Sequence, residues 1–188
     1  MDTYYPINYD KSIKKRRLIY DLSLTVIWSY ILCYFNAVVL LAMISVLSDW
    51  LFSNNSIGTT YFLVAVFFLV ILIFFLTTNF ILLNRTIKID GIEKEANKND
   101  MVTVLEQYYK LNNLDTNQDN MIRDARLSRS MRLGRVVTCL FDGHSVFLNI
   151  TRLERYNTFS PLSCVFNYYK CKRIAKKFQK LQSTTPYK

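Results

Sequence analysis

The sequence contains little of what catalysis needs. It has one histidine, His144, and only four glycines among 188 residues. Phosphate-binding loops and nucleophile elbows need glycines at fixed spacing, and no P-loop, G-x-G-x-x-G or G-x-S-x-G occurs. No Asp, Glu or Cys is spaced around His144 as a zinc site requires. We therefore expect a protein that is not an enzyme and has no cofactor, with His144 exposed beside a turn.

Basic residues are absent from one long stretch. None of the 24 Lys and Arg residues lies between Leu22 and Leu83, which holds two apolar segments joined by a short link. The run from Tyr61 to Leu83 carries no charge, and a helix of that length extends about 34 Å, enough to cross a hydrocarbon core of about 30 Å. We predict two transmembrane spans, at about 22–47 and 61–83, that form a hairpin over 21–84.

Two other interpretations of the first apolar run are weaker. A cleaved signal peptide has a shorter apolar region and an A-x-A site, which this run lacks. A buried helix with no polar side facing water is rare in a globular core. Within the run, Asn36 is expected to make a polar contact with the neighbouring helix. An ion pathway is disfavoured because no acid or base accompanies Asn36 in the membrane.

The distribution of charge predicts the orientation of the hairpin. Lys14–Arg17 precede the first span, Arg85 and Lys88 follow the second, and the link at 48–60 has no basic residue. By the positive-inside rule, both termini are cytoplasmic. The prediction is an integral protein of the cytoplasmic (inner) membrane, with a basic tail at 1–20.

The segment at 85–182 is expected to form a small α+β domain, followed by a tail at 183–188. Its pattern reads β-α-β-β-β-α, an antiparallel sheet with two helices. The helices are predicted at Asn97–Leu111 and Asn167–Leu181, and 112–120 is predicted as a polar loop. Within that loop, Asp115–Asp119 imitates an EF-hand opening, but Arg126 stands where a bidentate Glu is required. The thiols of the four cysteines are interpreted as small apolar groups, because no C-x-x-C or zinc spacing exists.

A hairpin is the clearest short-range signal. Asp142-Gly143 separates two β-rich runs and favours a two-residue type I′ turn. That turn predicts the cross-strand pairs Cys139–Val146, Val137–Leu148 and Phe141–His144. It also predicts one apolar face made of Val137, Cys139, Val146, Leu148 and Ile150.

Several of these patterns occur together in a known group. Two apolar spans precede I-K-I-D-G, L-G-R-V-V-T-C-L-F-D-G, V-F-L-N and a final N-x₆-I-A-K-K-F. This order resembles uncharacterised bacterial, Bacteroidetes-type, two-span membrane proteins with a small cytoplasmic α+β domain. Members commonly have W-G where this chain has Leu133-Gly134. The resemblance implies no catalytic residues.

The chain is basic, with a formal net charge of +10. Five arginines recur at every third position, and four more basic residues lie on one side of the last helix. A solvated edge is one interpretation of them, and binding of anionic headgroups, a nucleotide or nucleic acid is another, with nucleic acid disfavoured. The candidate anion-binding residues are Arg123, Arg126, Arg129, Arg132, Arg135, Lys172, Arg173, Lys176 and Lys177.

Two functions fit these expectations. The first is a non-enzymatic membrane protein whose basic module binds or regulates a partner or anionic lipid at the inner face. The second is a membrane-perturbing two-span effector that oligomerises on a cytoplasmic signal. The expected partners are the lipid bilayer and its anionic headgroups, a protein, or further copies of the chain.

Overall fold

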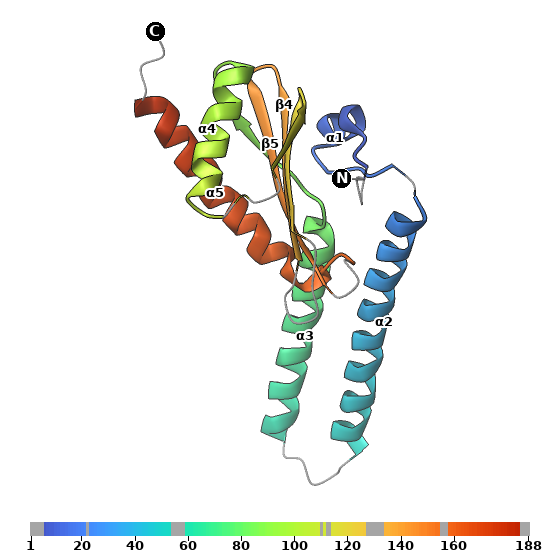
Figure 1. Cartoon of the computed structure of the whole chain (residues 1–188). Coiled ribbons are helices and arrows are strands. Elements are labelled where there is room, and N and C mark those ends of the chain that lie inside the picture. The colour runs from blue at the N-terminus through green and yellow to red at the C-terminus, as the bar shows by residue number, and fades with distance from the viewer. Residues whose placement is uncertain are drawn as a thin grey trace.

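A computed structural model gives the fold of most of the chain. It describes residues 6–21, 23–53, 59–109, 111, 114–126, 134–154 and 158–184, with some side chains inside α2, α3 and β2 also left out. The elements, shown in Figure 1, are α1 (Tyr9–Lys15), α2 (Leu24–Ser53), α3 (Thr59–Leu82), β1 (Ile87–Asp90), α4 (Lys94–Glu106), β2 (Leu114–Gln118), β3 (Met121–Arg126), β4 (Gly134–Asp142), β5 (Ser145–Leu153), the short 3₁₀ helix η2 (Pro161–Ser163) and α5 (Cys164–Thr184).

The strands form one antiparallel sheet in the order β1-β5-β4-β3-β2. The sheet therefore has one strand more than predicted, because 114–118 pairs with β3 instead of forming a loop. An edge strand needs a partner on one side only, so a polar sequence with no apolar alternation can still take that position. The sequence pattern missed β2 for this reason.

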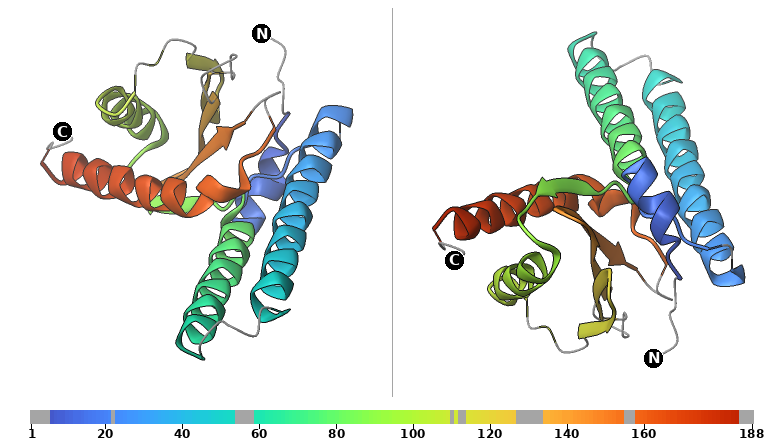
Figure 2. Two further views of the ribbon diagram at one scale, coloured as in Figure 1. Left: turned by 90° about the horizontal axis from the view of Figure 1, so that it is seen from below. Right: turned by 90° about the horizontal axis from the view of Figure 1, so that it is seen from above.

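Both faces of the sheet are covered (Figures 1 and 2). On one face, Val137, Cys139 and Phe141 of β4 pack with buried residues of α4 and α5. On the other face, Val136 and Leu140 pack with the N-terminal segment and with the chain that leads into α5. The alternation of side chains along a strand assigns odd positions of β4 to one core and even positions to the other.

The β4–β5 hairpin differs from its predicted register. Cys139 lies opposite Leu148, Phe141 opposite Val146, and Asp142 opposite Ser145, so the turn residues are Gly143 and His144. Only Gly143 has a positive φ, +54°, which is the pattern of a type II′ turn with glycine first, and not of type I′. The partner of each residue moves by two positions, which leaves every side chain on its predicted face. The predicted apolar face is accordingly present in the core.

Replacing Gly143 by Val is expected to destabilise the full chain by about 1–2 kcal/mol, because a β-branched residue resists positive φ. The Cβ itself would meet no atom within 4 Å, so the cost is conformational and not steric. Gly143→Asn is the matched variant, since Asn tolerates positive φ better. Thermal unfolding should rank wild type above Asn and Asn above Val. Equal stability of the two variants would contradict this assignment of the turn.

The two apolar runs form α2 and α3, which lie side by side and antiparallel (Figure 1). Of the helices in the part of the chain that the structure describes, none is long and apolar enough to cross a membrane. This finding contradicts the predicted membrane fold class, the transmembrane hairpin at 21–84 with its spans at 22–47 and 61–83, and the inner-membrane localisation with both termini cytoplasmic.

The ends of both apolar runs belong to the packed domain, which is the physical reason for the correction. At the start of α2, Val26 and Ser29 are buried, and Tyr30 packs against Phe159 with ring centres 5.3 Å apart. At the end of α3, Asn79 is fully buried. Because both runs lack charge, we predicted that these positions of α2 and α3 lie within the membrane spans. Farther along, both helices carry exposed apolar side chains, among them Phe35 and Phe74.

The N-terminal segment, expected as a polar tail, is part of the fold. Leu18 and Tyr20 are buried, and the Tyr20 ring stacks on Phe159 at 5.3 Å. The Leu18 amide donates to the carbonyl of Asn84 at 2.7 Å, so this segment pairs with the link between α3 and β1. The hydroxyl of Tyr9 donates to the carbonyl of Phe141.

Arg17 has a defined role in this arrangement. Its guanidinium donates to the carbonyls of Leu83 at 3.1 Å and Ile81 at 2.9 Å. These carbonyls belong to the C-terminal end of α3, where the helix leaves acceptors without partners and carries partial negative charge. A residue that we interpreted as a determinant of orientation therefore caps a helix.

Substituting Arg17→Gln is expected to lower the free energy of unfolding by about 1–2 kcal/mol, because the cap loses its charge and part of its hydrogen bonding. The control is Lys15→Gln, which removes the same charge from an exposed neighbour on α1. Urea unfolding of the full chain measures both. An equal, small effect of the two substitutions would contradict a capping role for Arg17.

Candidate functional site

The exposed side of α5 is a strongly basic surface. The apolar stripe of the helix, Cys171, Ile174, Ala175 and Phe178, is buried against the sheet. The spacing of i, i+3, i+4 and i+7 puts these residues on one side and leaves the basic residues on the other. Six basic side chains are exposed along α5: Lys170, Lys172, Arg173, Lys176, Lys177 and Lys180.

Tyrosines lie between these basic side chains. The Lys172 ammonium is 5.0 Å from the centre of the Tyr168 ring, and Lys177 is 5.3 Å from that of Tyr108. Cation–π attraction at this range needs no anion and leaves the charge at the surface. Among the described residues, no ion pair links a basic side chain of α5 to an acid. The positive charge of α5 is therefore not neutralised by an ion pair within the described part of the fold.

The five regularly spaced arginines do not form one group. Arg123 is buried, and the alternation of side chains along β3 places it on the face opposite to Arg126. Arg129 and Arg132 lie outside the described residues, as does the side chain of Asn36 in α2. Arg126 and Arg135 are directly opposite each other on β3 and β4. The structure thus brings two of the five together.

A third arginine completes a row that the sequence pattern missed. Arg135 also lies directly opposite Arg152 of β5, so Arg126, Arg135 and Arg152 cross three neighbouring strands. All three occupy the face that carries α4 and α5, because they alternate in step with the core residues Ile122, Val137 and Ile150. We call these three residues the arginine row. Strand pairing, which spacing within one segment does not reveal, was the missing information.

Arg135, the central residue of the arginine row, is held on several sides. Its guanidinium donates to the carboxylate of Asp124 at 2.7 Å and lies 3.8 Å from the centre of the Tyr109 ring. The Asp124 side chain is 3% exposed, so this ion pair is largely shielded from water. Lys170 of α5 lies 4.4 Å from the centre of the same Tyr109 ring. Two cations are therefore held against one aromatic ring at the end of the sheet.

The electrostatics of this cluster follow from burial and like charge. Burial lowers the pKa of Lys170, and the nearby charges of Arg135 and Arg152 lower it further. Burial also raises the pKa of Tyr109, against the opposing effect of Arg135. The Tyr109 hydroxyl is buried and has no hydrogen-bond partner among the described residues.

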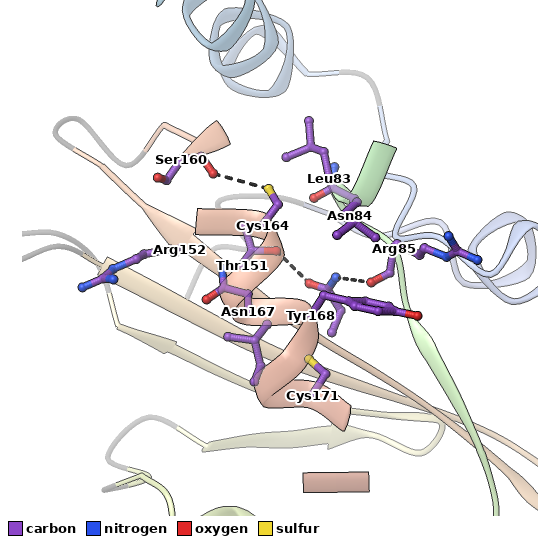
Figure 3. A pocket seen from close by; sticks show the side chains of 13 residues that line it. Leu83, Asn84, Arg85, Thr151, Arg152, Ser160, Cys164, Asn167, Tyr168 and Cys171 are labelled. Atoms are coloured by element: carbon purple, nitrogen blue, oxygen red, sulfur yellow. Dashed lines mark hydrogen bonds between the residues drawn. The ribbon is translucent and has the colours of Figure 1, made fainter. Parts of the chain in front are cut away.

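A small recess lies beside the arginine row, between β5, the α3–β1 link and the first turns of α5 (Figure 3). Asn149 donates to the carbonyl of Arg85 at 2.8 Å and accepts from the hydroxyl of Thr151 at 2.7 Å. The free volume is about 10 Å³, room for about one water molecule. These polar groups mainly satisfy one another, and we assign no ligand to the recess.

The thiols and acids of the described residues offer no metal set of three ligands. Cys139 and Cys171 are buried, and burial raises the pKa of both thiols, that of Cys171 to about 12. Asp115–Asp119 crosses from β2 into the turn before β3, and the side chains at 115–118 lie outside the description. His144 is exposed at the hairpin turn, where its Nδ1 contacts the carbonyl of Ile92.

Comparisons with protein-family models, curated proteins and solved structures found no match for this chain. The resemblance to two-span Bacteroidetes-type proteins therefore stays a prediction.

Replacing Tyr109 by Phe is expected to stabilise the protein by about 1 kcal/mol, because it removes a buried hydroxyl without a partner and keeps the ring under both cations. The substitution should also remove part of the stability loss at high pH. The folded state keeps the Tyr109 proton above the ordinary pKa of 10.0, where the unfolded state loses it, so stability falls as pH rises beyond that value.

The matched variant is Tyr109→Leu, which removes the ring as well and is expected to destabilise the protein. Urea midpoints measured near neutral pH and again in alkaline buffer give both comparisons. Phe and Leu variants that are destabilised to the same extent would contradict the view that the ring holds the cluster and the hydroxyl contributes nothing.

Proposed function

We propose that this chain is a non-enzymatic binding module that recognises an acidic segment of a partner protein through the exposed side of α5. The supporting observation is that this helix has six exposed basic residues, no acidic residue and no ion pair with the rest of the described fold. These like charges repel one another, so binding a negatively charged partner there is electrostatically favourable.

The tyrosines favour a protein partner over an anionic lipid surface. Tyr169 is 59% exposed beside Lys172, and Tyr168 lies half-buried under the same ammonium group. Tyrosine and arginine are enriched among the residues that contribute most to protein interfaces. A helix of 21 residues extends about 31 Å, which suits an extended acidic segment laid along it.

The buried side of α5 gives this surface a fixed shape. Ile174 and Phe178 are fully buried, and Gln182 donates to Asn97 of α4 at 2.7 Å. Since the helix is already ordered, binding does not have to order it. The alternative of a two-span effector required two membrane spans, and the contrary finding above removes the basis for it.

The test uses the full chain and a fluorescein-labelled peptide of alternating Glu and Ser. Fluorescence anisotropy should show binding that weakens with added salt, because exposed charges are screened. The double substitution Arg173→Gln and Lys176→Gln should weaken binding about tenfold, as expected for the loss of two exposed pairs. A peptide of alternating Gln and Ser should not bind.

The control is Lys14→Gln with Lys15→Gln, which removes the same charge from α1, where both residues are exposed. This pair should leave binding nearly unchanged. If the two double variants weakened peptide binding equally, binding would depend on net charge and not on the α5 surface. That result would contradict the proposal. Tighter binding to phosphatidylglycerol vesicles than to the acidic peptide would also contradict it.

A further inference from the structure

We infer that the arginine row, Arg126–Arg135–Arg152, forms together with Lys170 a binding site for a phosphate group at the end of the sheet. This site adjoins the proposed partner surface and shares Lys170 with it, whereas its three arginines come from strands. The inference does not depend on the proposed function.

The backbone brings the three arginines together. Arg135 pairs directly with Arg126 on one side and with Arg152 on the other. Neighbouring strands lie about 4.8 Å apart, so the three Cα atoms span about 10 Å on one face of the sheet. Arginine side chains are long enough to converge on one group from such positions.

The charge of the row is not balanced within the described fold. Like charges placed directly opposite each other destabilise a sheet, and here three occur in succession. Asp124 contacts the arginine row, where it forms an ion pair with Arg135. Neither Arg126, Arg152 nor Lys170 has an ion pair among the described residues. An anion bound between them would relieve repulsion that the free protein retains.

Two of the four cations of the site are held in place in the absence of a ligand. Asp124 and the Tyr109 ring hold Arg135 in place, and the same ring holds Lys170. The Nε of Arg135 is buried and has no hydrogen-bond partner among the residues that the structure describes, so these residues do not fully satisfy the group. Because the central cation is fixed, binding does not have to order it. Arg126 and Arg152 are exposed and free to close on the ligand.

Phosphate fits this arrangement better than a single carboxylate does. A phosphate monoester carries about −1.5 to −2 charges at neutral pH and three strong acceptor oxygens. A carboxylate brings one charge and two oxygens. Three guanidinium forks and an ammonium group, offset by one acid, match the larger charge and the larger number of acceptors.

The experiment is a calorimetric titration of the full chain with inorganic phosphate and, separately, with glycerol phosphate. Saturable binding of either supports the site. Tighter binding of glycerol phosphate identifies an organic phosphate as the ligand class, and equal binding identifies the free ion. The double substitution Arg126→Gln with Arg152→Gln should weaken binding about tenfold or more. The control Arg173→Gln with Lys176→Gln removes the same charge and should keep phosphate binding while binding the acidic peptide more weakly.

A second measurement separates loss of the site from loss of the fold. Without phosphate, the Arg126→Gln, Arg152→Gln protein should unfold at a higher temperature than the wild type, since repulsion in the row is relieved. A lower unfolding temperature would overturn the inference, as would acetate binding as tightly as phosphate. Equal weakening of phosphate binding by the two double variants, or no saturable binding at millimolar phosphate, would overturn it as well.

Discussion

Burial of β4 on both faces is the constraint on which the rest of the structure depends. The strand lies between β5 and β3, and its residues alternate between two cores, one under α4 and α5 and one under the N-terminal segment. A strand in this position has no side that can face water. Where the two covers end, at Arg135, the chain places a charge that Asp124 and Tyr109 accommodate. The arginine row is therefore located where the apolar sandwich stops.

The periodicity of the sequence predicted which face of the sheet a residue occupies better than it predicted which residues lie opposite each other on neighbouring strands. The amphipathic stripe of α5 and the apolar face of the β4–β5 hairpin followed from local spacing, because each depends on one segment alone. The register failed because Gly143 stands first in a type II′ turn, and a turn type depends on φ and ψ that the pair Asp142-Gly143 does not determine. The arginine row was missed because Arg152 is far from Arg126 in sequence and meets it only through β4.

The apolar runs show a limit of counting uncharged residues. Asn79 lies within the predicted second span, and its amide donates to the carbonyl of Phe75 at 2.8 Å. Its oxygen, however, accepts from the Val165 amide at 3.1 Å and so satisfies the first turn of α5. A long uncharged segment can thus end inside a domain core. Hydropathy alone does not distinguish residues that pack in a domain core from residues that face lipid. Tertiary contacts are needed to distinguish them.

The central claim is that the end of a fully covered sheet gathers three arginines and a lysine around one anion. A crystal structure of the full chain grown with selenate, a heavy-atom analogue of tetrahedral oxyanions, tests this most directly. The account predicts an anomalous selenium peak bounded by the guanidinium groups of Arg126, Arg135 and Arg152 and by the Lys170 ammonium group. Selenate bound only elsewhere, with the three guanidinium groups turned away from one another, would contradict it.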